Sequence, residues 1–206
     1  MKWGWLCGWS IDRNAFKALC RELLPGIEPV VEAPTRSGRD KLLASNVDIF
    51  AGYSLGAWLL IDAAARGWKP KQSPYLLAPF IAFPAEAGVG GRVRRSQLRV
   101  VSRNLAVDAS AAVCDFSKRA NLSAPTTHPP LKDEFTEGLT FLNDVSLSKV
   151  PDEVRTWHAY VGALDSLVDA IELARHWPEL RIVPQAGHDP KALLAAVSAE
   201  IYNHAL

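Results

Sequence analysis

Short apolar stretches of strand length alternate with longer amphipathic stretches along nearly the whole chain. The apolar stretches predict strands at residues 2–7, 27–32, 47–51, 73–78, 157–161 and 180–184. The amphipathic stretches predict helices at 13–24, 55–66 and 190–202, and a polar connection, helical or irregular, at 36–44. Strands that alternate with helices form a parallel sheet with right-handed crossovers and helices on both faces. The pattern therefore predicts an α/β fold with about six mostly parallel strands.

The alternation is interrupted between residues 80 and 154, where no stretch resembles a central strand. This segment contains a glycine-rich stretch at 88–91, two predicted helices and a proline-rich loop at 124–130. Insertions of this size in an α/β sheet usually carry a function, and one after the fourth strand lies above the carboxyl ends of the strands. We therefore expect a core made of 1–79 and 155–206 and a cap, or lid, made of 80–154.

The most specific motif is Gly52-Tyr53-Ser54-Leu55-Gly56, which directly follows one predicted strand and precedes a predicted helix. A serine that projects into a cleft must sit on a tight, strained turn, and small residues on both sides let the strand and helix pass each other. The helix N-terminus also favours a developing oxyanion. GxSxG alone is a weak pattern, and a glycine-rich turn without chemistry would share it. The strand–turn–helix context favours Ser54 as a nucleophile.

A serine hydroxyl needs a base to take its proton, and in this context the base follows the last strand. His188 lies in that position, between the last predicted strand and the last predicted helix. For the other four histidines a packing or surface role is the simpler interpretation: His128, His158, His176 and His204.

The base in turn needs an orienting acid, and Asp165 lies in the loop just after the fifth predicted strand. Asp169, four residues later, is expected to cap the next helix or to lie in its first turn. For four other aspartates we expect a solvated helix or loop face: Asp62, Asp108, Asp115 and Asp144. Asp165 is therefore the predicted acid.

An oxyanion requires two N–H donors. The main-chain N–H of Leu55, directly after the nucleophile, is the first candidate, and that of Trp9, in the loop after the first strand, is the second. The Trp9 ring either lines an acyl pocket or merely covers the core. Phe80 and Phe83, at the start of the cap segment, are further candidate substrate contacts.

Composition excludes several functional classes. The chain has 206 residues with 49% hydrophobic and 22% charged residues, which is ordinary for one globular domain. A net charge of +1 gives no reason to expect nucleic acid or an anionic membrane as partner. The apolar N-terminus is too short for a signal peptide or a membrane span, and Cys7, Cys20 and Cys114 suit buried thiols in a reducing compartment. We therefore expect a cytoplasmic protein. No spacing of metal ligands occurs, and the predicted chemistry needs no cofactor.

The chain resembles the α/β-hydrolase superfamily, and within it the carboxylesterases of biotin synthesis that cleave the methyl ester of pimeloyl-acyl carrier protein. The resemblance rests on Gly8-Trp9, the stretch 52–56, the stretch 162–168 and Gly187-His188. It implies Ser54 as nucleophile, Asp165 as acid, His188 as base, and Trp9 and Leu55 as oxyanion donors. The chain departs from the family pattern in two ways, and both weaken the inference about the substrate. Cys7 stands where the family usually has a histidine before Gly8, and the antiparallel hairpin that usually precedes the first strand is not expected.

Basic residues are concentrated in the cap segment. Between residues 88 and 106 there are five arginines and no acidic residue. Arg95, Arg99 and Arg103 recur every four residues and share one helical face, whereas Leu98, Val101 and Leu105 lie on another face suited to covering a cleft. The arginines either form a solvated face or bind an anionic partner, such as the acidic acyl carrier protein that the resemblance implies.

These observations predict a serine hydrolase that cleaves a carboxylic ester, free or carrier-bound, through an acyl-enzyme. Two alternatives stay open. A lyase or synthase of the same fold could use the same three residues, and a non-catalytic binding protein could keep the fold alone. Three intact triad side chains argue against the second alternative, because a binding module has no chemical need for them.

Overall fold

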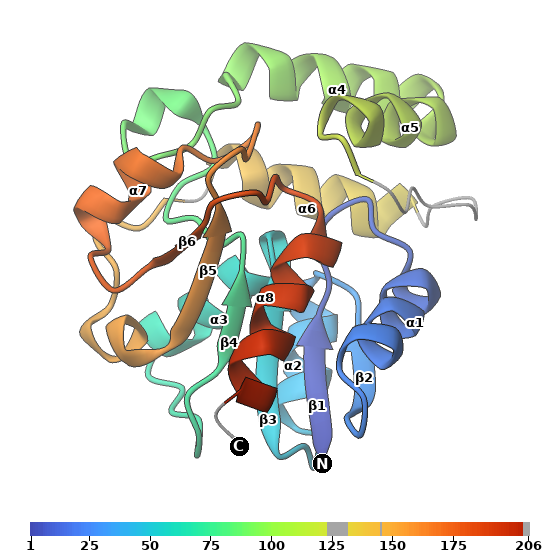
Figure 1. The fold of residues 1–206 in the computed structure, drawn as a ribbon. Helices are drawn as coiled ribbons and strands as arrows, with labels where there is room; N and C mark the ends of the chain where they lie inside the picture. The colour runs from blue at the N-terminus through green and yellow to red at the C-terminus, as the bar shows by residue number, and fades with distance from the viewer. Residues whose placement is uncertain (123–131, 145, 204–206) are drawn as a thin grey trace.

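The computed structural model describes residues 1–122, 132–144 and 146–203, and the loop that carries His128 and the terminal His204 lie outside them. Its six strands form one sheet in the order β2-β1-β3-β4-β5-β6, and every neighbouring pair is parallel (Figure 1). The strands are β1 (Lys2–Leu6), β2 (Glu28–Glu32), β3 (Ile49–Tyr53), β4 (Tyr75–Leu77), β5 (His158–Gly162) and β6 (Arg181–Val183). The predicted α/β architecture with about six strands is confirmed.

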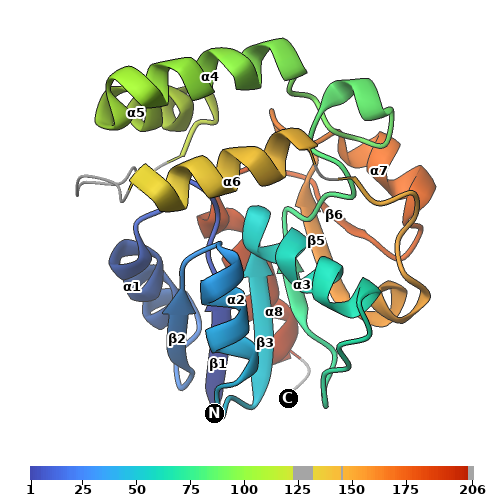
Figure 2. The same ribbon diagram turned by 180° about the vertical axis from the view of Figure 1, so that it is seen from behind.

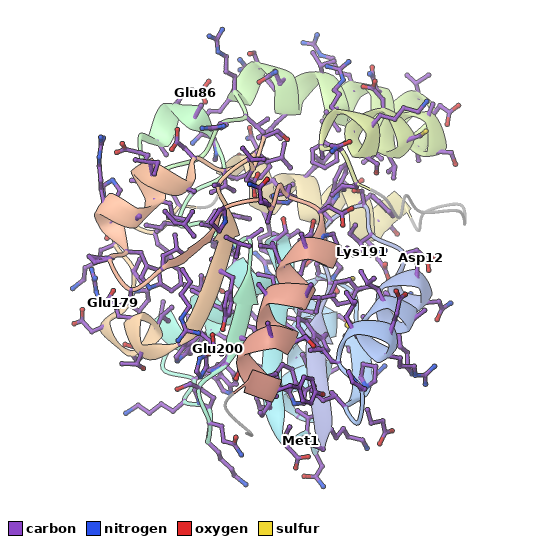
Figure 3. The ribbon with its side chains drawn as sticks, in the orientation of Figure 1. Met1, Asp12, Glu86, Glu179, Lys191 and Glu200 are labelled. Atoms are coloured by element: carbon purple, nitrogen blue, oxygen red, sulfur yellow. The ribbon has the colours of Figure 1, made fainter. Side chains whose placement is uncertain are left out.

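Helices cover both faces of the sheet. On one face lie α1 (Arg13–Leu23) and α8 (Pro190–Asn203), and on the other lie α2 (Arg36–Leu43) and α3 (Leu55–Ala65) (Figures 1 and 2). Helix α7 (Ala170–His176) follows β5, and two short 3-10 helices are η1 (Ala85–Ala87) and η2 (Asp152–Thr156). Asp12 caps α1 by accepting the Ala15 N–H at 2.8 Å (Figure 3).

Three helices of the segment 80–154 lie above the carboxyl ends of the strands: α4 (Arg95–Val107), α5 (Ala109–Arg119) and α6 (Lys132–Asp144) (Figure 1). The sequence predicted two helices there, which is wrong for the described part of the segment. Asp108 ends α4 and also caps α5, where it accepts the Ala111 N–H at 2.9 Å, so the two helices are nearly continuous in sequence.

Helix α6 contains Gly138, a residue that disfavours helices. A Cβ at this position would lie 2.3 Å from Cδ1 of Trp9, so the close approach of the indole requires the glycine. Packing against the core therefore outweighs the poor local propensity. No helix in the described part of the chain is both long and apolar enough to cross a membrane. Cys7 and Cys20 are buried as predicted, but Cys114 is exposed.

Candidate active site

Ser54 occupies the tight turn between β3 and α3. Its backbone has φ 53° and ψ −115°, a conformation that non-glycine residues seldom adopt. The Ser54 N–H donates to the Leu77 carbonyl at 2.8 Å, and its own carbonyl accepts the Trp58 N–H at 3.1 Å. These bonds fix the serine between two strands and the first turn of α3, at the carboxyl edge of the sheet.

Gly56 lets the helix approach the sheet. A Cβ at this position would lie 2.1 Å from the main-chain oxygen of Leu6 on β1. Main-chain atoms of a central strand cannot move aside, so the second glycine of the motif is required by packing. This explains physically why the GxSxG pattern appears at this turn.

Ser54, His188 and Asp165 meet at this edge from three loops that are distant in sequence. Nε2 of His188 lies 3.0 Å from Oγ of Ser54, and Nδ1 lies 2.7 Å from Oδ2 of Asp165. All three are buried, with exposed fractions of 7%, 4% and 0% in that order. An ionised carboxylate only accepts, so a proton on Nδ1 leaves the lone pair of Nε2 facing the hydroxyl. The arrangement can therefore remove the serine proton.

The Asp165 carboxylate has further donors. Its Oδ1 accepts the N–H groups of Leu167 at 2.8 Å and Val168 at 2.9 Å, while Oδ2 faces His188. These bonds direct one oxygen of a fully buried carboxylate toward the imidazole. Asp169, the alternative considered for the acid, caps α7 as expected.

Tyr53 supports the histidine, which the sequence did not suggest. Its hydroxyl donates to the main-chain oxygen of His188 at 2.8 Å, and the two rings lie 5.6 Å apart. Burial, and secondly the nearby charge of Asp165, raise the pKa of Tyr53 well above its usual value, so the hydroxyl stays protonated. Tyr53 occupies a variable position of the motif, which gives no signal for this role.

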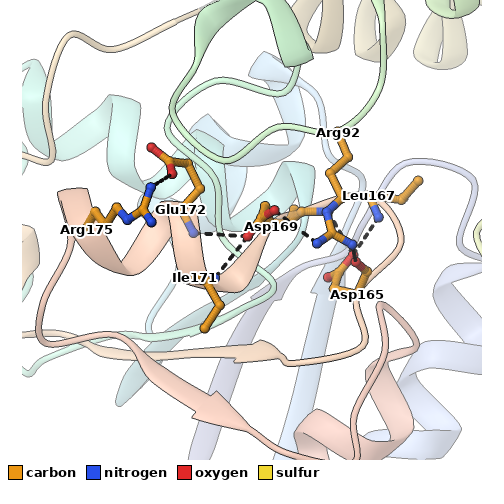
Figure 4. Close-up of polar contacts among 8 residues, drawn as sticks. Arg92, Asp165, Leu167, Asp169, Ile171, Glu172 and Arg175 are labelled. Carbon is orange, nitrogen blue, oxygen red and sulfur yellow. Dashed lines mark hydrogen bonds and ion pairs between the residues drawn. The ribbon is translucent and has the colours of Figure 1, made fainter.

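Arg92 supports the acid, and it too was not singled out from the sequence. It belongs to the cap segment just before α4, and its guanidinium donates to the main-chain oxygen of Asp165 at 3.0 Å and to Asp169 at 3.0 Å (Figure 4). Arg92 lies in the arginine-rich stretch but outside the four-residue spacing of Arg95, Arg99 and Arg103. Only the contact across the fold distinguishes it.

The two predicted oxyanion donors lie where the motif requires them in the chain. Leu55 is the first residue of α3, and Trp9 lies in the loop after β1. Within the described residues, neither main-chain N–H donates a hydrogen bond. Their role as oxyanion donors stays a prediction.

The Trp9 ring is buried beneath the cap helices. Its Nε1 donates to the Phe135 carbonyl on α6 at 3.0 Å, and its ring packs edge-on against Phe135 and against Phe116 on α5. The ring therefore joins the loop after β1 to two cap helices. Phe80 and Phe83 are also fully buried, with ring centroids 5.1 Å apart.

The three evenly spaced arginines of α4 have different surroundings. Arg95 is half-buried: its side chain donates to the Asn143 carbonyl, and its main-chain N–H donates to Glu86. Arg99 and Arg103 are exposed and form no ion pair with any described residue. Leu98 and Leu105 on the same helix are buried.

Asp62 corrects one expectation from the sequence. It was expected on a solvated face, but it is 7% exposed and pairs with Arg39 at 3.1 Å and Arg66 at 2.9 Å. The apolar helix α3 is buried on nearly all sides, so its one carboxylate is buried with it. Two arginines compensate for the lost hydration.

A cavity of about 160 Å³ lies between α4 and α5 and reaches Leu167 in the loop after β5; its lining is mostly apolar but includes Gln97, Asn104, Asp115 and Arg119. Its walls include Leu167, whose N–H binds Asp165, and Phe116, whose ring contacts Trp9. Val93, Leu98 and Val101 contribute further apolar surface. The cavity thus meets the acid loop at Leu167, and Ser54, His188 and Asp165 are not among the residues that line it.

Comparison with solved structures gives matches across the whole chain. An esterase from Exiguobacterium antarcticum has a TM-score of 0.70 at 14% identity, covering 99% of this chain and 91% of its own. BioG from Haemophilus influenzae has 0.56 at 13% identity, covering 91% and 88%, and an alpha/beta hydrolase fold protein from Chitinophaga pinensis has 0.56 at 10%, covering 98% and 89%. No family model and no curated protein sequence gives a significant match. The chain has the α/β-hydrolase fold.

Proposed function

We propose that this protein is a serine hydrolase that cleaves carboxylic esters through an acyl-enzyme on Ser54. The observation that carries the proposal is the continuous hydrogen-bonded series from the Ser54 hydroxyl through His188 to Asp165, at 3.0 and 2.7 Å. A buried series of this kind has a chemical purpose in acyl transfer, because each member activates or orients the next. The fold shared with esterases agrees with the proposal but does not by itself fix the chemistry.

The reaction proceeds in two halves. Nε2 of His188 takes the Oγ proton of Ser54 while Oγ bonds to the ester carbonyl carbon, and the carbonyl electron pair moves onto oxygen. The N–H groups of Leu55 and Trp9 stabilise this oxyanion. When the carbonyl re-forms, the alkoxide leaves with the proton from His188, and the acyl group stays on Ser54.

Water completes the cycle. It attacks the acyl-enzyme and gives a proton to Nε2 of His188, and the second tetrahedral oxyanion is held by the same donors. Its collapse breaks the bond to Oγ, which recovers the proton from His188, and releases the carboxylic acid. Asp165 holds the imidazole in position and stabilises its charged form throughout.

A carrier-bound ester is the finer form of the proposal. It rests on the resemblance to carrier-protein esterases and on the exposed Arg99 and Arg103, since uncompensated cations favour an acidic partner. Replacing both by Glu should lower kcat/KM for an ester on acyl carrier protein about tenfold or more, and leave free esters unaffected. Equal activity on the carrier-bound ester before and after this change would contradict the docking role.

Hydrolysis of p-nitrophenyl esters of graded chain length tests the proposed function. The intact chain should turn over short esters, Ser54→Ala should abolish turnover, and Ser37→Ala, at an exposed serine of α2, should not. A folded Ser54→Ala variant that keeps the activity would overturn the assignment. A folded protein that turns over no ester would favour the lyase alternative.

A further inference from the structure

The cap segment contacts the acid loop along a short strip. The Arg92 N–H donates to the Leu167 carbonyl at 3.0 Å, and the Asp169 N–H donates to the Gly90 carbonyl at 2.6 Å. Between these two bonds, Gly91 forms an isolated antiparallel bridge with Val168. Residues 90–92 therefore pair with 167–169 like the start of a two-stranded sheet.

The Arg92 guanidinium spans the same loop from its other side. One terminal nitrogen donates to the main-chain oxygen of Asp165 at 3.0 Å, and the other contacts the Asp169 carboxylate at 3.0 Å (Figure 4). The planar guanidinium holds two acceptors in one fixed geometry, which an ammonium group cannot do. Arg92 thus fixes the distance between the two ends of the loop.

The far end of this loop is itself rigid. Oδ1 of Asp169 accepts the N–H groups of Ile171 at 3.1 Å and Glu172 at 3.0 Å and so caps α7. The hydrogen bond from the Glu172 N–H, and secondly the one from the Arg92 guanidinium, lower the pKa of Asp169. The carboxylate therefore stays charged, and Arg92 is anchored to the first turn of a helix.

The near end is the triad acid. The Asp165 carboxylate is oriented by the N–H groups of Leu167 and Val168, and both belong to the strip that pairs with 90–92. Pairing with 90–92 therefore holds the strip that carries these two donors, and the guanidinium holds the main-chain oxygen of Asp165 itself.

We propose that Arg92 is a positioning residue for the catalytic acid, through which the cap segment holds Asp165 in line with His188. This inference rests on the proposed function, because it assigns Arg92 a role in the same site. The consequence is that the triad is complete only while residues 90–92 stay docked against the acid loop. Arg92 itself touches neither Ser54 nor the imidazole in the described contacts.

Three variants of the full-length chain test the role of Arg92. Arg92→Gln removes the fork, Arg92→Lys keeps the charge but loses the two-acceptor geometry, and Arg175→Gln is the matched control. Arg175 also pairs with a carboxylate, Glu172 on α7, but within the described part of the chain it contacts no residue of the acid loop (Figure 4). Activities are expressed per site titrated with a fluorophosphonate, so that misfolded protein is not counted.

Arg92→Gln should lower kcat about ten- to hundredfold, as expected for a displaced catalytic group, with KM changed less than about twofold. Arg92→Lys should have a kcat between those of Arg92→Gln and the wild type. Arg175→Gln should match the wild type in both respects.

A second readout needs no substrate. The hydrogen-bonded Nδ1–H of His188 should give a downfield proton resonance that is lost or shifted in Arg92→Gln and kept in Arg175→Gln. An unchanged resonance would overturn the inference even if no ester is ever hydrolysed. A kcat per titrated site of Arg92→Gln within twofold of the wild type would overturn it as well. Failure of the proposed function alone would leave the resonance difference intact.

Discussion

Replacing Tyr53 by Phe removes one hydroxyl from the interior and leaves the main-chain oxygen of His188 without its donor. The bond is 2.8 Å long, and Tyr53 is 1% exposed, so water cannot readily replace the hydroxyl. A buried acceptor that loses its partner costs about 1–3 kcal/mol. The same carbonyl belongs to the residue whose imidazole faces Ser54, so the change should affect both stability and rate.

The stability loss should be visible by thermal and urea unfolding. For a chain of 206 residues, each kcal/mol corresponds to about 2–4 °C in Tm, so we expect Tm to fall by roughly 2–12 °C. If the same change raises the activation free energy by about 1 kcal/mol, kcat falls about fivefold. The expected KM is unchanged, because Tyr53 lies behind the histidine.

Tyr75→Phe is the matched control for this experiment. Tyr75 is only partly buried, and its hydroxyl has no hydrogen-bond partner in the described part of the chain, so Tm should change little. Equal Tm values for wild type and Tyr53→Phe would refute the reasoning. So would a Tyr75→Phe variant that is as strongly destabilised, because the effect would then not come from the His188 carbonyl.

Two further predictions concern packing and pH. Gly56→Ala places a Cβ 2.1 Å from the Leu6 oxygen and should lower the free energy of unfolding, measured in urea, by about 1–3 kcal/mol or more. A Gly56→Ala variant as stable as the wild type would contradict the required close approach. Burial opposes ionisation of Glu200 (Figure 3), but hydrogen bonds from Tyr160 and Arg181 outweigh it and lower the pKa of Glu200 from 4.5. A lowered folded pKa adds stability above pH 4.5 that is lost as the pH falls through the folded value. Wild-type Tm should therefore fall more steeply than that of Glu200→Gln in acid, and parallel Tm curves would contradict this.

The fold and the convergence of Ser54, His188 and Asp165 were predictable because they depend on local signals. The strand of apolar residues before Ser54, the glycines around it and the helix after it are all contiguous in sequence. His188 and Asp165 were then selected by their places after successive strands. The strand boundaries were predicted less accurately. The strand predicted at 47–51 is Ile49–Tyr53, because regular pairing with β4 continues to the turn.

Support for the triad was not predictable, because it comes from contacts between distant residues. Arg92 reaches Asp165 across 73 positions, and Tyr53 reaches His188 across 135. Neither pairing leaves a periodic or spaced pattern in the sequence. The number of helices in the cap segment was underestimated for the same reason. Gly138 disfavours a helix at α6, and the Trp9 indole that packs against it is distant in sequence.

Covalent trapping is the sharpest test of Ser54 as the nucleophile. The folded protein is treated with a fluorophosphonate, and the modified residue is located by mass spectrometry, with Ser54→Ala and His188→Ala as controls. We expect one adduct on Ser54, none in Ser54→Ala, and much slower labelling in His188→Ala. An unlabelled Ser54 in folded protein, or labelling whose rate is independent of His188, would contradict it.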